Sequence, residues 1–187
     1  MRPYLRVANV FEDHIDTTDV KEMHWADGTF ERFRLHRGDI LLNEGQTPDL
    51  LGRPAMYRGE PAEVAFTNSL IRFKAGTGVL PEFALLVFRR HMHAGRFKQE
   101  SRITTNIAHL SAARLKPIEF PIPPVAEQQR LVEIAGLRLE AVRRVEVETR
   151  AQQFRSRGIS RGLLAAAFSG KLTAMRTDTE IIEENAQ

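Results

Sequence analysis

A proline-rich segment divides this sequence into two parts of different character. Four of the nine prolines, at positions 117, 121, 123 and 124, fall between Lys116 and Glu127. Proline fixes φ and has no backbone N–H, so this segment is expected to be extended and cannot form a helix interior. The chain before it has mixed strand and helix patterns, whereas the chain after it has no proline at all. We predict an α+β fold, in which a strand-rich domain precedes a long coiled-coil-type helix.

Length and composition narrow the class of protein. With 187 residues, 42% of them hydrophobic and 27% charged, the chain is expected to form one domain, or one domain with an appendage. It has no cysteine, which excludes disulfides and thiolate metal sites. No apolar run approaches the length of a membrane span, and the first residues do not resemble a secretory signal. A cysteine-free chain fits a reducing compartment, so we expect a cytoplasmic location.

The first part contains patterns for several short elements. We predict strands at residues 4–11, 32–35, 40–43, 55–57 and 69–73, and helices at residues 19–23 and 81–94. Ser111 is expected to cap a single helical turn that ends at Leu115. The predicted domains are a strand-rich domain over residues 1–120, a helical region over 121–172 and an acidic, disordered tail over 173–187.

The second part begins with Pro124, which suits the first turn of a helix. From there to Arg157, Gly136 is the sole helix-weakening residue, so one long helix is expected. Apolar residues with 3-4-3 spacing predict a seam for a partner helix, formed by Val132, Ala135, Leu139 and Val142. The alternative is a long amphipathic helix that packs on its own domain.

A basic stretch lies at the end of the first part. Residues 89–116 carry seven Lys and Arg side chains against one acid, Glu100. Such a stretch in a nearly neutral chain is typical of contacts to a phosphate backbone, although a solvated helix face has the same pattern. The candidate DNA-binding residues are Arg89, Arg90, Arg96, Lys98, Arg102, Thr104, Thr105, Asn106 and Arg114. Arg96 and Arg102 could also bind guanine through both guanidinium nitrogens.

Motifs for catalysis are not apparent. The sequence has no phosphate-binding glycine-rich loop and no serine in a nucleophile elbow. His91 and His93 are two residues apart on the predicted helix and would face different directions, so we predict no metal site. We therefore predict no catalytic residues, no metal and no cofactor in this chain.

Four segments together resemble the DNA specificity subunit of type I restriction–modification systems. They are residues 3–10 (PYLRVANV), residues 38–45 (GDILLNEG) with Leu51-Gly52-Arg53, residues 118–132 (IEFPIPPVAEQQRLV) and residues 163–172 (LLAAAFSGKL). The third and fourth segments are the most specific. The four segments also match the family in their order and spacing, and together the resemblance covers residues 3–172.

The resemblance implies a non-catalytic DNA-binding protein. In the family, two recognition domains are each followed by a helix, the helices pair antiparallel, and each domain recognises half of an interrupted DNA site. Adenine-N6 methyltransferase (M) subunits and a restriction (R) subunit bind to this assembly. S-adenosylmethionine, ATP and magnesium are accordingly expected on the partner subunits.

This chain departs from the family pattern because it contains one recognition domain and one helix. It also begins where the family usually has further residues upstream. It is thus expected to act as a half-length subunit, completed by a second copy or by another half subunit, with a palindromic target for a homodimer. A truncated reading frame or a fragment would look the same. The alternative functions are a coiled-coil adaptor that binds no DNA, and the specificity chain of a system with fused cleavage and methylation.

Overall fold

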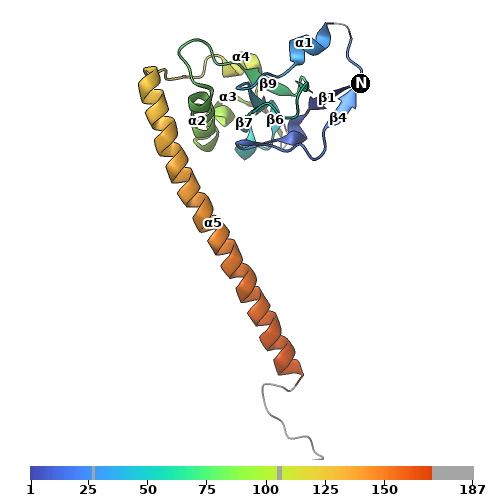
Figure 1. The fold of residues 1–187 in the computed structure, drawn as a ribbon, viewed down its shortest axis with the longest axis vertical. Helices are drawn as coiled ribbons and strands as arrows, with labels where there is room; N and C mark the ends of the chain where they lie inside the picture. Colours follow the sequence, from blue (N-terminus) through green and yellow to red (C-terminus); the bar gives the residue numbers. More distant parts are fainter. Residues whose placement is uncertain (27, 105–106, 170–187) are drawn as a thin grey trace, which may run out of the picture. The chain divides into compact units, whose positions relative to one another are not determined.

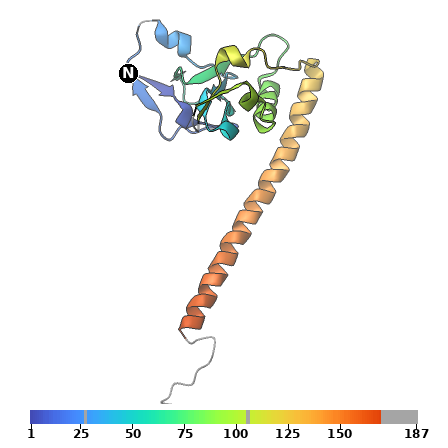
Figure 2. The ribbon, with the colours of Figure 1, turned by 180° about the vertical axis from the view of Figure 1, so that it is seen from behind.

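The computed structural model describes residues 1–26, 28–104 and 107–169, shown from two sides in Figures 1 and 2. The chain divides into two units, of which the first comprises residues 1–134 and the second begins at Ala135. The first unit contains the strands, four short helices and the beginning of the long helix. In this unit, α2 and α3 lie at one end, and β1 and β4 lie at the other (Figure 1).

The strands of the first unit are short and form four small sheets. Their bounds are β1 Arg2–Leu5, β2 Val10–Phe11, β3 His14–Ile15, β4 Lys21–Met23, β5 Ile40–Asn43, β6 Gly45–Gln46, β7 Pro54–Met56, β8 Ala65–Phe66, β9 Leu70–Phe73, β10 Arg102–Thr104 and β11 Ile107–His109. The strand orders are β4-β1-β8, β7-β5-β9, β10-β11-β6 and β2-β3.

The helices are α1 Thr29–Phe33, α2 Pro81–His93, α3 Arg96–Glu100, α4 Ala112–Leu115 and α5 Val125–Phe168, with single 3-10 turns at Val7–Asn9 and Pro48–Leu50. Together with the strands, they give the predicted α+β fold, in which a strand-rich region precedes a long helix. No helix in the described parts of the chain is long and apolar enough to span a membrane.

The central strand β5 lies between two hydrophobic cores. Side chains alternate across a strand, so Ile40 and Leu42 face one side and Leu41 faces the other. Ile40 and Leu42 pack in the core that includes α2, with Phe88 and Met92. Leu41 packs in the second core, with residues of β1 and β8. All four residues of β5 are buried, which explains why this segment lacks polar alternation.

Several predicted elements are confirmed. Strands occupy residues 40–43, 54–56 and 70–73, and α2 covers most of the predicted helix at 81–94. Ser111 caps α4, with its side chain accepting a hydrogen bond from the backbone N–H of Arg114. The proline segment is not helical before Val125, where α5 begins. The long helix is also confirmed, but it ends at Phe168 and not near Arg157, because the Ala- and Leu-rich segment after Gly162 favours helix.

The strand predicted at residues 4–11 is wrong in its middle, where a 3-10 turn interrupts it. Buried Asn9 causes the bend. Its side-chain oxygen accepts from the backbone N–H of Arg6 at 3.0 Å, and its amide donates to the carbonyl oxygens of Asp16 and Asp19. These bonds fold the chain back over its first strand, so that β2 and β3 form a separate hairpin.

Two further predictions are wrong because tertiary packing overrides local propensity. Residues 21–23 form β4, not a helix, since they pair antiparallel with β1 in the register Arg2↔Met23. Residues 32–33 end α1 and do not begin a strand, because the turn at Gly28 starts a helix that buries Phe30 against the ring of Trp25.

Candidate nucleic-acid interface

The β10–β11 hairpin carries one exposed face. Arg102 on β10 lies opposite His109 on β11, and both side chains are exposed. Ala108 is fully buried and anchors the hairpin to the core, while β11 continues the sheet through β6. Thr104 is the last residue of β10. The hairpin, whose strand β11 also pairs with β6, has one anchored and one exposed face, and a two-stranded β-ribbon is one of the shapes that the major groove of DNA admits.

The candidates Thr105 and Asn106 lie outside the described residues. In the sequence they follow the last residue of β10 and precede the first residue of β11.

Arg114 lies beside the start of the hairpin. Its Nη1 donates to the carbonyl oxygen of Glu100 at 3.0 Å, two residues before Arg102. Among the residues that the structure describes, no carboxylate pairs with Arg102 or with Arg114. Both cations therefore keep a charge that an external phosphate can neutralise.

Three other predicted DNA contacts are already paired within the protein. Arg89 donates from Nε to Glu12 at 2.7 Å, and its side chain is only 16% exposed. Arg96 contacts Glu100 at 2.6 Å and Glu119 at 3.0 Å. The remaining pair joins Lys98 to Asp49 across 3.4 Å, with both side chains well exposed. Arg90 lies exposed on α2.

The ion pairs stabilise the charged forms of their partners. Hydrogen bonds from Arg96 to Glu100 and then to Glu119 raise the pKa of Arg96 above its ordinary value. Burial tends to raise the pKa of Glu12, but hydrogen bonds from His93 and Arg89 outweigh it, so that this pKa lies below its ordinary value. Glu12 thereby fixes the β2–β3 hairpin to α2, a structural role that the sequence did not indicate.

His91 and His93 have separate surroundings, as their spacing predicted. His91 is buried and its Nε2 lies 2.9 Å from the carbonyl oxygen of Glu119. His93 is exposed and its Nε2 lies 2.9 Å from Glu12. A search of the described residues finds no group of three potential metal ligands.

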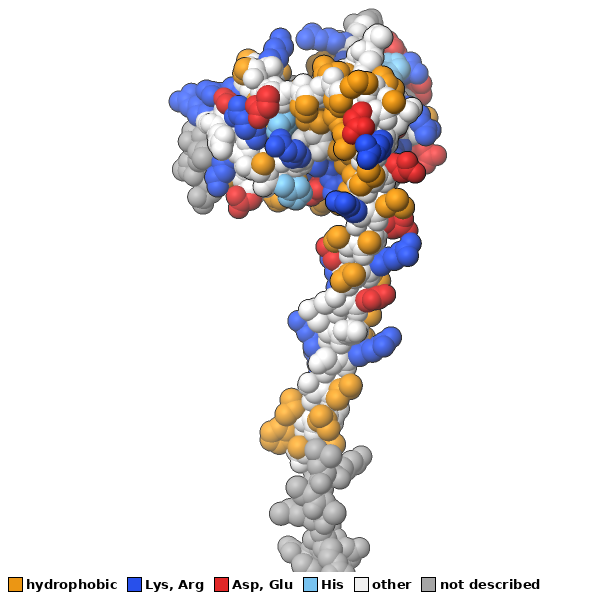
Figure 3. Space-filling model, turned by 90° about the vertical axis from the view of Figure 1, so that its left-hand side faces the viewer, with side chains coloured by type: hydrophobic (Ala, Val, Ile, Leu, Met, Phe, Trp, Pro, Cys, Tyr) orange, Lys and Arg blue, Asp and Glu red, His pale blue; other side chains and the backbone are white. Residues whose placement is uncertain are grey.

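The second unit consists, in its described part, of α5 from Ala135 onward. Nearly all its side chains are exposed, including Val142 at 54%, Val145 at 62% and Leu163 at 54%. Figure 3 shows hydrophobic side chains interspersed with charged ones along the helix and gathered near its end. Of the predicted seam, Val132, Ala135 and Leu139 are half-buried and Val142 is exposed.

The full length of α5 shows a second apolar pattern that the sequence analysis missed. Ala135, Val142 and Leu163 are separated by multiples of seven, and so are Leu131, Val145 and Ile159. The positions between them in the two series hold polar residues, namely Arg138, Thr149, Gln152 and Ser156. These two series are three and four residues apart, which places them on one stripe of the helix. The stripe shares Ala135 and Val142 with the predicted seam and extends it toward Leu163, because the helix continues past Gly158.

Gln128 has a structural role that the sequence analysis did not single out. Its side chain is fully buried near the start of α5. Its Nε2 donates to the carbonyl oxygens of Gly78 at 2.7 Å and Pro123 at 2.8 Å, and its Oε1 accepts from the backbone N–H of Leu80 at 2.8 Å. The sequence does contain one indication of this role, because a side-chain amide follows a proline-rich segment, where backbone groups lack partners.

Comparisons with known proteins show which sequences this chain is similar to. A family model described as "Type I restriction modification DNA specificity domain" matches residues 3–137. The putative type I restriction enzyme MjaX specificity subunit of Methanocaldococcus jannaschii is 25% identical over 139 residues, which is 71% of this chain and 32% of that protein.

Two further relatives have similar names. The type I restriction enzyme EcoKI specificity subunit of Escherichia coli is 22% identical over 174 residues, covering 92% of this chain and 38% of the relative. The type I restriction enzyme StySPI specificity subunit of Salmonella potsdam is 24% identical over 147 residues, covering 76% of this chain and 31% of the relative. The chain thus spans about a third of the length of the curated relatives that it matches.

Proposed function

Because this chain belongs to the family of type I restriction modification DNA specificity domains, we propose that it recognises a DNA sequence for separate methyltransferase and restriction subunits. The observation that carries this proposal is the exposed face of the β10–β11 hairpin, with Arg102 and Arg114 beside it and no carboxylate partner for either among the described residues. In this proposal the hairpin reads base edges, while the two arginines contact phosphates.

The remaining cations of the basic stretch have divided roles in this proposal. Arg90 and Lys98 are exposed and supply further phosphate contacts. Arg89 and Arg96 hold the hairpin of β2 and β3, α3 and the proline segment in place through their carboxylate partners. The base-reading role of Thr104, Thr105 and Asn106 remains part of the proposal.

We further propose that α5 pairs antiparallel with a second copy of α5. An isolated helix of this length with exposed apolar side chains gains stability from burying them against a partner. Two copies around a twofold axis would then present two identical domains, so the DNA target would be an interrupted palindrome. As a specificity subunit, the chain itself would perform no chemistry, and the methylating and cleaving activities would reside on its partners.

The test is selection from a randomised DNA duplex pool at moderate salt, with the purified chain alone and together with a methyltransferase subunit from the same genome. Enrichment of a two-part palindrome supports both recognition and pairing. Enrichment of a single half-site supports recognition without pairing. A pool that stays random, with protein that is folded by circular dichroism, contradicts DNA recognition and favours an adaptor that binds only proteins.

A further inference from the structure

A pocket with an apolar lining and a cationic border lies in the first unit, next to the segment that leads into α5. Its volume is about 370 Å³, and it lies between β9, α2, α4 and the residues after α4. Its apolar side chains are Ile71, Phe73, Phe88, Leu115, Ile118 and Phe120. The rings of Phe73 and Phe120 stack with centroids 5.6 Å apart, and Phe88 meets Phe73 edge-on. The lining is therefore a preformed aromatic surface.

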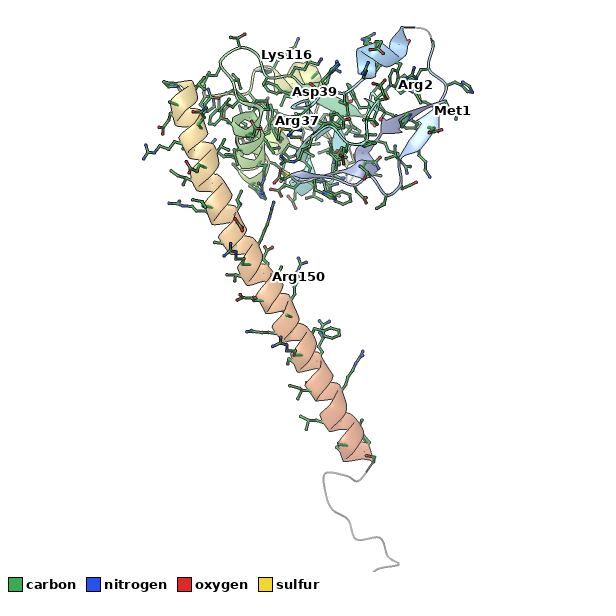
Figure 4. All side chains as sticks on the ribbon, in the orientation of Figure 1. Met1, Arg2, Arg37, Asp39, Lys116 and Arg150 are labelled. Atoms are coloured by element: carbon green, nitrogen blue, oxygen red, sulfur yellow. The ribbon has the colours of Figure 1, made fainter. Side chains whose placement is uncertain are left out.

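The charged border of the pocket has an excess of positive charge. Lys74 and Lys116 are both exposed, and no carboxylate pairs with either one within the described part of the chain. Glu119 also lines the pocket, but its carboxylate is engaged by Arg96 at 3.0 Å. Figure 4 shows Lys116 beside α4 at the surface of the first unit. An occupant should accordingly combine apolar side chains with carboxylates.

One segment of this chain has that composition. Residues 178–184 read DTEIIEE, so Ile181 and Ile182 are flanked on both sides by acidic residues. No lysine or arginine follows Arg176. The segment lies outside the described residues, and the case for it rests on its composition and its place in the sequence.

The order of segments along the chain indicates whether the acidic segment comes from the same chain or from a second copy. The pocket residues 112–120 come just before α5, and the acidic segment follows α5. In an antiparallel pair, the end of one helix lies beside the start of the other. We propose that residues 178–184 of a second copy of this chain occupy the pocket, with the isoleucines on the aromatic lining and the carboxylates against Lys74 and Lys116. This inference rests on the helix pairing in the proposed function.

Engineered cysteines test the proposal cleanly because the chain has none of its own. One chain carries Asn185→Cys, just beyond the acidic segment, and a second, differently tagged chain carries Ala112→Cys, an exposed residue at the pocket. The matched control is Ala26→Cys, which is also exposed but lines a different hollow beside Met1 and Arg2. The two full-length chains are mixed and oxidised, and the disulfide-linked heterodimer is quantified.

We expect about ten-fold more cross-linked heterodimer with Ala112→Cys than with the control, because docking raises the local thiol concentration. Adding Lys74→Glu and Lys116→Glu to the Ala112→Cys chain should reduce the yield to the control level. Equal yields at the two positions would overturn the proposal. So would a monomeric chain in sedimentation, or a cross-link that forms within one chain and does not depend on concentration when both cysteines are placed together.

DNA selection with the wild-type chain, set beside cross-linking of the cysteine variants, separates this inference from the function on which it rests. A dimer that selects a palindromic DNA target, but gives equal cross-linking at residues 112 and 26, retains the proposed function and loses the docked segment. A pocket-specific cross-link in a protein that selects no DNA retains the docked segment and removes DNA recognition from the proposed function.

Discussion

The side-chain oxygen of Gln128 accepts a hydrogen bond from the backbone N–H of Leu80 at 2.8 Å. Leu80 is the N-cap residue of α2 and has no side-chain cap of its own. The bond therefore joins the start of α5 to the start of α2, within the first unit. The amide nitrogen of Gln128 adds bonds to two carbonyl oxygens, so every polar atom of this buried side chain has a partner.

Replacing Gln128 should test this junction. We expect Gln128→Ala to lower the free energy of unfolding by about 3 kcal/mol, because it leaves buried backbone groups without partners. Gln128→Glu should cost at least as much, since it turns a donor toward two carbonyl oxygens into an acceptor. The neighbouring Gln129→Ala is the control, because Gln129 is exposed and should have little effect. Urea denaturation of the three variants measures the difference, and equal midpoints for the residue 128 and 129 variants would refute it.

Gly52 should tolerate no side chain. Its φ is +67°, and a Cβ at this position would lie 2.4 Å from Cδ2 of Phe97, which is fully buried. Gly95 has a similar φ of +69° but has open space around it. Gly95→Ala therefore measures the backbone cost alone, about 1 kcal/mol. We expect Gly52→Ala to cost about 1–3 kcal/mol more, from overpacking against Phe97. Thermal unfolding of both variants provides the comparison, and similar losses would show that Phe97 moves aside freely.

The contact between Glu12, Arg89 and His93 should make stability depend on pH. The pKa of Glu12 is lowered in the folded chain, so its contribution is complete above the ordinary glutamate pKa and is lost as the pH falls through the folded value. We therefore expect the stability of the wild type to fall between about pH 5 and pH 3 more steeply than that of Glu12→Gln. At pH 7 the variant should be less stable by about 1–2 kcal/mol, because the half-buried Arg89 loses a charged partner.

Chemical denaturation at several pH values measures this effect. Glu22→Gln is a suitable control, because Glu22 is exposed and forms no ion pair in the described structure. Parallel curves for the wild type and Glu12→Gln across the acidic range would contradict the assigned role of Glu12.

The sequence predicted the elements whose signals are local, and it missed those that depend on distant contacts. The apolar residues of β5, the Pro81 start of α2 and the serine cap of α4 each act within a few residues, and these elements are confirmed. In contrast, β4 forms only because β1 provides a pairing edge. Its residues have no strand pattern of their own, so no local rule could have identified them.

The same distinction applies to the candidate interface. Counting charges suggested Arg89 and Arg96 as DNA contacts, but Glu12, the partner of Arg89, lies far away in the sequence, and Arg96 pairs with distant Glu119 as well as with nearby Glu100. A charge that looks free in the sequence can thus be paired in the fold. In the described residues Arg102 and Arg114 have no carboxylate partner, and their contact with DNA stays a prediction.

Arg102 should contribute to DNA affinity without contributing to folding. If it contacts one phosphate, Arg102→Ala should weaken binding to all sequences and reduce the slope of log affinity against log salt by about one. The paired Arg96 is the contrast, since Arg96→Ala should mainly lower the unfolding temperature by breaking its contacts to Glu100 and Glu119. Fluorescence anisotropy at several salt concentrations measures the slope, and an unchanged slope for Arg102→Ala would remove this residue from the interface.

The apolar stripe on α5 can be tested with two valines of nearly equal exposure. Val145 is 62% exposed and Val147 is 66% exposed, but only Val145 lies in the seven-residue series with Leu131 and Ile159. Two residues apart on a helix point in different directions, so a partner helix that covers Val145 leaves Val147 in solvent. We expect Val145→Glu to raise the dimer dissociation constant about ten-fold or more, from the cost of burying a carboxylate at a helix seam. Val147→Glu should leave it unchanged, and both are measured by analytical ultracentrifugation. An equal effect of the two substitutions would show that the helices do not pair through this stripe.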